Sequence, residues 1–89
     1  MARFEMADVE IASIGEARPN SEDFFELGML HSAGLDVETD LVAAHKWFNL
    51  AAARGNAEAA YYRQQVAAEM SAADVAVAQR AAREWLTTH

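Results

Sequence analysis

The chain of 89 residues contains no cysteine, one proline and four isolated glycines. The lack of cysteine excludes disulfide bonds and thiolate metal ligands. The single proline is Pro19, so no proline interrupts a helix in the rest of the chain. The glycines lie singly at positions 15, 28, 34 and 55, which excludes a glycine-rich loop of the kind that holds nucleotide phosphates.

Long apolar runs and basic residues are also scarce. No segment approaches the roughly 18 consecutive apolar residues of a membrane-spanning helix, and the first ten residues, MARFEMADVE, lack the apolar core of an export signal. We therefore expect a cytoplasmic protein with no membrane segment. Seven basic residues stand against fourteen acidic ones, which gives a net charge of −7. Nucleic acid is not expected as a partner, because phosphate binding needs a concentrated basic surface.

The acidic residues are concentrated in the N-terminal part of the chain. Residues 1–40 contain ten of the fourteen acidic residues and two of the seven basic ones. One interpretation is a solvated acidic face that aids solubility. The other is electrostatic guidance of a basic partner, or of a second copy of the chain that binds head to tail.

Apolar residues recur at helical spacing and predict four helices, over 22–33, 40–54, 56–70 and 72–87. N-cap residues precede each of them: Asn20 or Ser21, Thr39 or Asp40, Asn56, and Ser71. The connections are short, so consecutive helices are expected to pack antiparallel. The sequence thus predicts an all-α fold, with residues 1–20 as an N-terminal arm or short helix and residues 21–89 as a helical-repeat domain.

Much of the apolar fraction is alanine, so the core is expected to rest on a few large residues. These are Phe24, Phe25, Leu27, Leu30, Trp47, Phe48, Leu50, Tyr61, Tyr62, Trp85 and Leu86.

Residues 27–59 combine small and large residues at fixed spacings. Gly28 and several alanines lie where two helices must approach closely, while Trp47 and Phe48 fill the space that the small residues leave. This pattern resembles one unit of the Sel-1-like repeat, a family related to the tetratricopeptide repeats. The positions that carry the resemblance and are expected to pack within the repeat are Leu27, Gly28, Gly34, Ala44, Trp47, Phe48, Ala51, Ala52, Gly55 and Ala59.

The unit departs from the family pattern at two positions. His31 stands where the family usually has tyrosine, and Asp36 replaces the second glycine of the loop. The chain from Ala59 onward resembles the start of a degenerate second unit, and the last helix resembles the caps that end such arrays. The resemblance implies an α/α solenoid of antiparallel helix pairs.

The resemblance also implies a binding role, since most family members are adaptors that bind other proteins. The leading hypothesis is a small protein–protein interaction module, an adaptor or regulator without catalysis of its own. Its groove is expected on the first helix of each pair, at Glu26, Met29, Leu30, Tyr61 and Arg63. One alternative is a β-lactam-binding or β-lactam-hydrolysing enzyme, as linked to some disulfide-bridged bacterial relatives, although this chain has no cysteine for such bridges. Another is a purely structural oligomer.

No catalytic, cofactor or metal site is predicted. The three histidines, at positions 31, 45 and 89, form no HxxxH or ExxxH pair that would place two ligands on one helical face. His31 is expected to be a partly buried packing residue, and His45 is expected on the helix surface. None of the four serines lies in a GxSxG sequence.

A helical-repeat unit cannot bury both of its faces alone, and arrays generally need about three units. This chain has one clear unit and one degenerate unit, so its own ends or a second copy must cover the open faces. We expect a homodimer formed mainly through residues 1–30. The negative charge of this region opposes close association, so dimerisation should strengthen with added salt.

Overall fold

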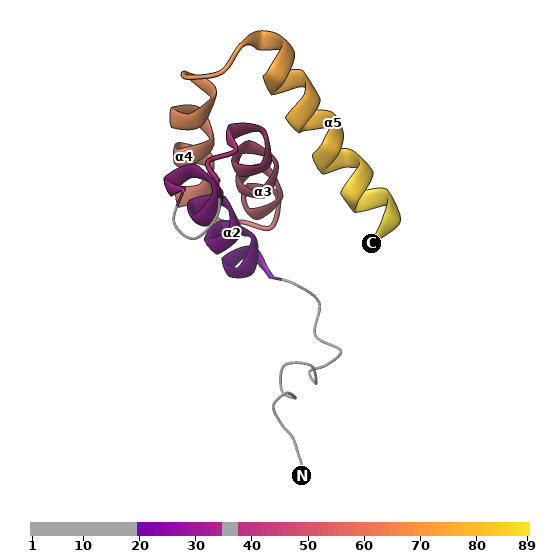
Figure 1. Ribbon diagram of the computed structural model, residues 1–89. Helices are drawn as coiled ribbons and strands as arrows, with labels where there is room; N and C mark the ends of the chain where they lie inside the picture. The colour runs from indigo at the N-terminus through magenta and orange to yellow at the C-terminus, as the bar shows by residue number, and fades with distance from the viewer. Residues whose placement is uncertain (1–19, 35–37) are drawn as a thin grey trace.

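A computed structural model of the chain describes residues 20–34 and 38–89. This part contains four helices and no strand: α2 (Ser21–Ala33), α3 (Leu41–Ala53), α4 (Ala57–Ala67) and α5 (Ala72–Thr88). Figure 1 shows how they are arranged. The all-α prediction is confirmed. The N-terminal arm over residues 1–19 and the loop positions Asp36 and Val37 lie outside the described residues.

Polar caps fix where each helix begins. The side chains of Asn20, Asp40, Asn56 and Ser71 each accept a hydrogen bond from the backbone N–H three residues later, at 2.9–3.0 Å. At α2 the cap is reciprocal, because the Asp23 carboxylate accepts from the Asn20 N–H at 3.0 Å. These bonds satisfy amide groups that a helix N-terminus otherwise leaves without a partner.

The expected end of α4 at residue 70 differs from the observed end at Ala67. The next backbone bonds run from Glu69 N–H to the Val66 carbonyl and from Met70 N–H to the Ala67 carbonyl, both at 3.0 Å. These hydrogen bonds span three residues, as in a 3₁₀-helix, instead of the four of an α-helix. Such a tighter last turn is common at a helix C-terminus.

Helices α2 and α3 form an antiparallel pair. Arg54, at the end of α3, lies 5.2 Å from the centre of the Phe24 ring in the first turn of α2. Near the opposite end, the Asp40 N–H donates to the His31 carbonyl at 3.0 Å. Between them, a Cβ atom added to Gly28 would lie 2.6 Å from two ring carbons of Phe48. The absence of a side chain at position 28 therefore allows the two helices to approach.

Helix α3 is the centre of the molecule and packs against α2, α4 and α5. Its inward residues are Ala44, His45, Phe48, Leu50 and Ala51, all of them buried. The expected packing of α5 against its chain neighbour α4 is not observed: α5 packs mainly against α3, and Figure 1 shows α4 and α5 on different sides of α3. The small buried residues Ala78 and Ala82 allow α5 to lie close to the rest of the fold.

An aromatic cluster joins α2, α3 and α5. The Trp85 ring meets Phe24 edge-on at a centroid distance of 5.1 Å and Trp47 at 6.3 Å. Trp47 also stacks on Phe24 at 5.8 Å. The last turns of α5 are thereby held against the first turn of α2.

The residues that carry the resemblance occupy three kinds of position in this fold. Gly28, Ala44, Phe48, Ala51 and Ala59 are buried, and Leu27, Trp47 and Ala52 are half-buried. Gly34 and Gly55 have φ angles of 72° and 100°, a region that favours glycine.

Two of the residues expected in the core are exposed instead. Tyr61 is 58% exposed and Leu86 is 47% exposed. The neighbouring rings of Tyr62 and Trp85 take the inward positions of α4 and α5, where they contact Phe48 and Phe24. On a helix, adjacent residues lie about 100° apart, so Tyr61 and Leu86 are turned outward. The largest fully buried side chains of the core are those of Phe24, Phe48 and Leu50.

Candidate functional site

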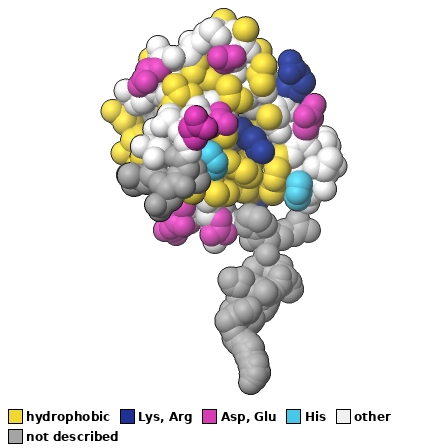
Figure 2. Space-filling view, in the orientation of Figure 1, with side chains coloured by type: hydrophobic (Ala, Val, Ile, Leu, Met, Phe, Trp, Pro, Cys, Tyr) yellow, Lys and Arg dark blue, Asp and Glu magenta, His cyan; other side chains and the backbone are white. Residues whose placement is uncertain are grey.

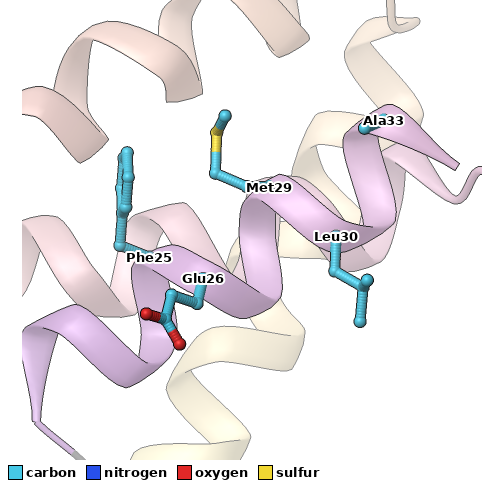
Figure 3. A pocket seen from close by; sticks show the side chains of 5 residues that line it. All are labelled: Phe25, Glu26, Met29, Leu30 and Ala33. Atoms are coloured by element: carbon cyan, nitrogen blue, oxygen red, sulfur yellow. The ribbon is translucent and has the colours of Figure 1, made fainter. Parts of the chain in front are cut away.

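Helix α2 carries a hollow that is open to solvent. Its volume is about 280 Å³, and it is lined by Phe25, Glu26, Met29, Leu30 and Ala33. Figure 3 shows the side chains of Phe25 and Met29 on one side of the helix and those of Glu26 and Leu30 on another. The local sequence explains the lining, because Phe25, Met29 and Ala33 recur every four residues and therefore lie along one flank of α2.

A second hollow, of about 410 Å³, lies beside the first and shares Glu26 and Leu30 with it. Its other lining residues are Asp23 and Leu27. We call the seven residues that line the two hollows the α2 surface. Apart from Glu26 and Asp23 this surface is apolar, and both of these carboxylate-bearing residues are exposed.

Met29 supplies exposed apolar area to the α2 surface. It is 36% exposed and is one of four large hydrophobic residues that are exposed in the described part of the chain, with Tyr61, Val77 and Leu86. Figure 2 shows one face of the molecule, where hydrophobic side chains are interspersed with acidic and basic ones. Isolated exposed hydrophobic residues are normal, but Met29 lies in a hollow with other apolar side chains.

Aromatic contacts connect the α2 surface to α4. The Phe25 ring lies 5.7 Å from Tyr62, and Tyr62 lies 5.3 Å from Tyr61. Phe25 also contacts Phe48 at 5.8 Å, so its ring is anchored in the core while it lines the hollow. The aromatic contacts thus run from Phe25 on α2 to Tyr62 on α4.

Arg63 lies apart from this region. It is half-buried, and its Nη1 donates a hydrogen bond of 2.7 Å to Oδ1 of Asn49 on α3. Of the five residues expected to form the groove, the structure brings Glu26, Met29 and Leu30 together, leaves Tyr61 outside the lining of both hollows, and directs Arg63 toward α3.

The position of His45 differs from the sequence-based expectation. It was expected on the helix surface but is only 3% exposed, because it lies on the face of α3 that packs inside the molecule. Its Nδ1 is buried without a hydrogen-bond partner among the residues that the structure describes. Burial lowers the pKa of His45, and the positive charge of Arg63 lowers it further. The ring is therefore neutral at pH 7.

The other two histidines have local partners. His31 is half-buried, and its Nδ1 donates to the Leu27 carbonyl at 2.9 Å, which fits the expected packing role. His89 stacks on Trp85 at a centroid distance of 4.2 Å. Within residues 20–34 and 38–89, no group of three or more histidine, aspartate or glutamate residues is placed to hold a metal ion. Nor is any helix in these ranges both long and apolar enough to cross a membrane.

Sequence reasoning missed part of the α2 surface. Phe25 was assigned to the core because of its size, and Ala33 and Asp23 were not singled out for binding. The fourfold spacing of Phe25, Met29 and Ala33 was the available signal, since Met29 was already expected to be exposed. The chemistry that this surface offers is apolar contact combined with negative charge.

The sequence matches no protein-family model and no curated protein, and the structure matches no solved structure.

Proposed function

We propose that this chain is a small protein–protein interaction module of the Sel-1-like repeat type, with no catalysis of its own. The observation that carries the proposal is the α2 surface, where Phe25, Met29, Leu30 and Ala33 line an open hollow. Exposed apolar side chains that gather in a concave region are typical of binding sites.

The packing of equivalent helices supports the repeat part of the proposal. In a solenoid, successive units stack so that each unit contacts its neighbour. If α2 and α3 form one unit and α4 and α5 the next, the first helices of the units touch through Phe25 and Tyr62, although α4 and α5 scarcely contact each other. The second helices meet through Trp47 and Trp85. The close contact of Gly28 with Phe48 and the positive φ angles of Gly34 and Gly55 also agree with the roles that the resemblance gives them.

The apolar region across α2 and α4 supports the binding part of the proposal. Met29 on α2 and Tyr61 on α4 are both exposed, and the rings of Phe25 and Tyr62 connect the two helices. Because Phe25 contacts the buried Phe48, the floor of this region is rigid, which lowers the entropic cost of binding a partner.

Site-specific photo-crosslinking tests the proposal. A photoreactive amino acid replaces Met29 in one full-length variant and Val77 in a matched control. Both positions are exposed and apolar, but Val77 lies on α5. We expect a discrete protein to crosslink at position 29 in the native cell and to be absent at position 77. Identical crosslinking patterns at the two positions would contradict a specific site on α2.

A second variant tests whether the apolar hollow supplies the affinity. Met29→Ser removes apolar area from the hollow and should weaken capture of the crosslinked protein about tenfold, since burying a methionine side chain contributes roughly 1.5–3 kcal/mol. Val77→Ser is the control and should leave capture unchanged. If the two substitutions weaken capture equally, the hollow does not contact the captured protein.

A further inference from the structure

The charged side chains of the α2 surface are all acidic. Glu26 lines both hollows and Asp23 lines one of them, and Glu22 is exposed in the first turn of the same helix. The basic side chains in the described part of the chain lie on or beside the other helices: Lys46, Arg54, Arg63, Arg80 and Arg83. Arg54 does approach α2, but it lies over the ring of the buried Phe24 and so on the core-facing side.

From this arrangement we infer that the α2 surface binds a positively charged amphipathic helix of a partner protein. The inference rests on the proposed function and adds the chemical class of the partner. Charge complementarity favours a positively charged partner. A partner with carboxylates along its edges would place them beside Glu26 and Asp23, where like charges repel.

The shape of the α2 surface favours a helix as the bound segment. Phe25, Met29 and Ala33 follow one another at intervals of four residues, which is about 6 Å along a helix axis. A partner helix presents apolar side chains at similar intervals on one face. Lysine and arginine at the margins of that face can lay their methylene groups on apolar surface while their charged ends reach Glu26 and Asp23.

Two synthetic peptides of about 18 residues test the inference by fluorescence anisotropy with the full-length chain. Both carry the same leucine and alanine face, and the other positions are lysine in one peptide and glutamate in the other. We expect the lysine peptide to bind at least about tenfold more tightly, since several exposed charge pairs act together. The difference should shrink as sodium chloride is raised from about 50 to about 500 mM, because salt screens exposed charges.

A charge-reversal variant of α2 and a control on α5 test whether the lysine peptide binds at the α2 surface. The double variant Glu22→Lys and Glu26→Lys should lose most of the preference for the lysine peptide. Asp23 is left unchanged because it caps α2. The control Glu84→Lys makes the same kind of change at an exposed position on α5 and should retain the preference. Amide chemical shifts in the presence of the lysine peptide should move at Phe25, Met29 and Ala33.

Several outcomes would overturn the inference. Equal affinity for the two peptides, or absence of binding by either, would show that the surface does not select a basic helix. A preference that survives Glu22→Lys and Glu26→Lys would place the binding elsewhere and reflect only the net charge of the protein. A second copy of the chain that excludes the lysine peptide from α2, detected by sedimentation at the same concentrations, would also overturn it. The crosslinks at position 29 are measured separately, so a partner that crosslinks there through an acidic segment would leave the proposed function intact.

Discussion

At position 28, the missing side chain decides how closely α2 and α3 approach. An added Cβ would lie 2.6 Å from two carbons of the Phe48 ring, and Phe48 is fully buried, so its ring cannot move aside into solvent. We expect Gly28→Leu to lower the free energy of unfolding by about 1–3 kcal/mol or more, as overpacked cores do. Urea unfolding followed by circular dichroism measures this change.

The expected cost of Gly28→Ala is smaller, because alanine gains about 1 kcal/mol of helix propensity over glycine and offsets part of the clash. The control Ala76→Leu introduces the same side chain at an exposed position of α5 and should change stability by less than about 0.5 kcal/mol. Equal losses for Gly28→Leu and Ala76→Leu would mean that the contact with Phe48 is not tight.

His45 makes the stability of the fold depend on pH. Its pKa is lowered by burial and by Arg63, whereas the unfolded chain has the ordinary value of about 6.5. The unfolded state therefore binds more protons between the two pKa values. The free energy of unfolding is highest above about pH 6.5 and falls as the pH drops toward the lower pKa of the folded state.

Replacement of His45 by leucine tests this pH dependence. The variant should lose the decrease in urea midpoint between about pH 7 and pH 5.5. At neutral pH it should be more stable by roughly 1–3 kcal/mol, because it removes a buried nitrogen that has no hydrogen-bond partner. His89→Gln, at an exposed position, is the control and should keep the decrease. A decrease of unchanged size in His45→Leu would assign it to other groups.

At the scale of the helices, α5 depends on aromatic contacts to hold it in place. Trp85 contacts Phe24 and Trp47 and is half-buried. We expect Trp85→Ala to lower the free energy of unfolding by about 2 kcal/mol, roughly half the cost of removing a fully buried tryptophan. Because these ring contacts anchor the last turns of α5, their loss should also let α5 open locally, and trypsin should cleave faster at Arg80 and Arg83.

The neighbouring residue supplies the control for this experiment. Leu86 is also large and apolar but is 47% exposed, so Leu86→Ala should leave the rate of cleavage at Arg83 nearly unchanged. If both substitutions accelerate cleavage equally, the helix is not held by the aromatic cluster. Cleavage is read out on the folded protein at low trypsin concentration, where it follows local opening of α5.

The sequence predicts the helices better than it predicts their packing. Helix starts are local, because caps such as Asn56 and Ser71 bond to amides three residues away, and such signals can be read from spacing alone. The docking of α5 onto α3 instead of α4 is not local. It depends on whether Trp85 finds Phe24, which lies about 60 residues earlier in the chain, and no sequence period encodes that choice.

The candidate site shows the same limit. Glu26 and Met29 line the hollow, as positions expected on the outer side of the helix can, whereas Leu30, which was also expected in the core, is half-buried. The sequence alone could not show that Arg63 lies apart from these residues, because its hydrogen bond to Asn49 joins two different helices. His45 was misplaced for a related reason: α3 is packed on three sides, so it has little exposed surface and a polar residue on it can be buried.

At the scale of the whole molecule, the uneven charge predicts opposite responses to salt for the expected homodimer and for the proposed binding of a basic helix. The homodimer expected through residues 1–30 stays a prediction, and residues 1–19 lie outside the described part of the chain. Such a dimer would bring two acidic α2 helices together, so screening by salt should strengthen it. Binding of a basic helix to the same surface should weaken with salt, because the charges attract each other.

Sedimentation velocity at tens of micromolar, in about 50 and about 500 mM sodium chloride, tests this prediction. The full-length chain should shift toward the dimer as salt is raised, and a shortened chain of residues 20–89 should sediment as a monomer at both concentrations. Glu26→Lys should make dimerisation of the full-length chain less dependent on salt, since it reduces the repulsion, while Glu84→Lys on α5 should not. If the full-length chain is monomeric at both salt concentrations, the dimer prediction is wrong. In that case no second copy of the chain covers the α2 surface at either salt concentration.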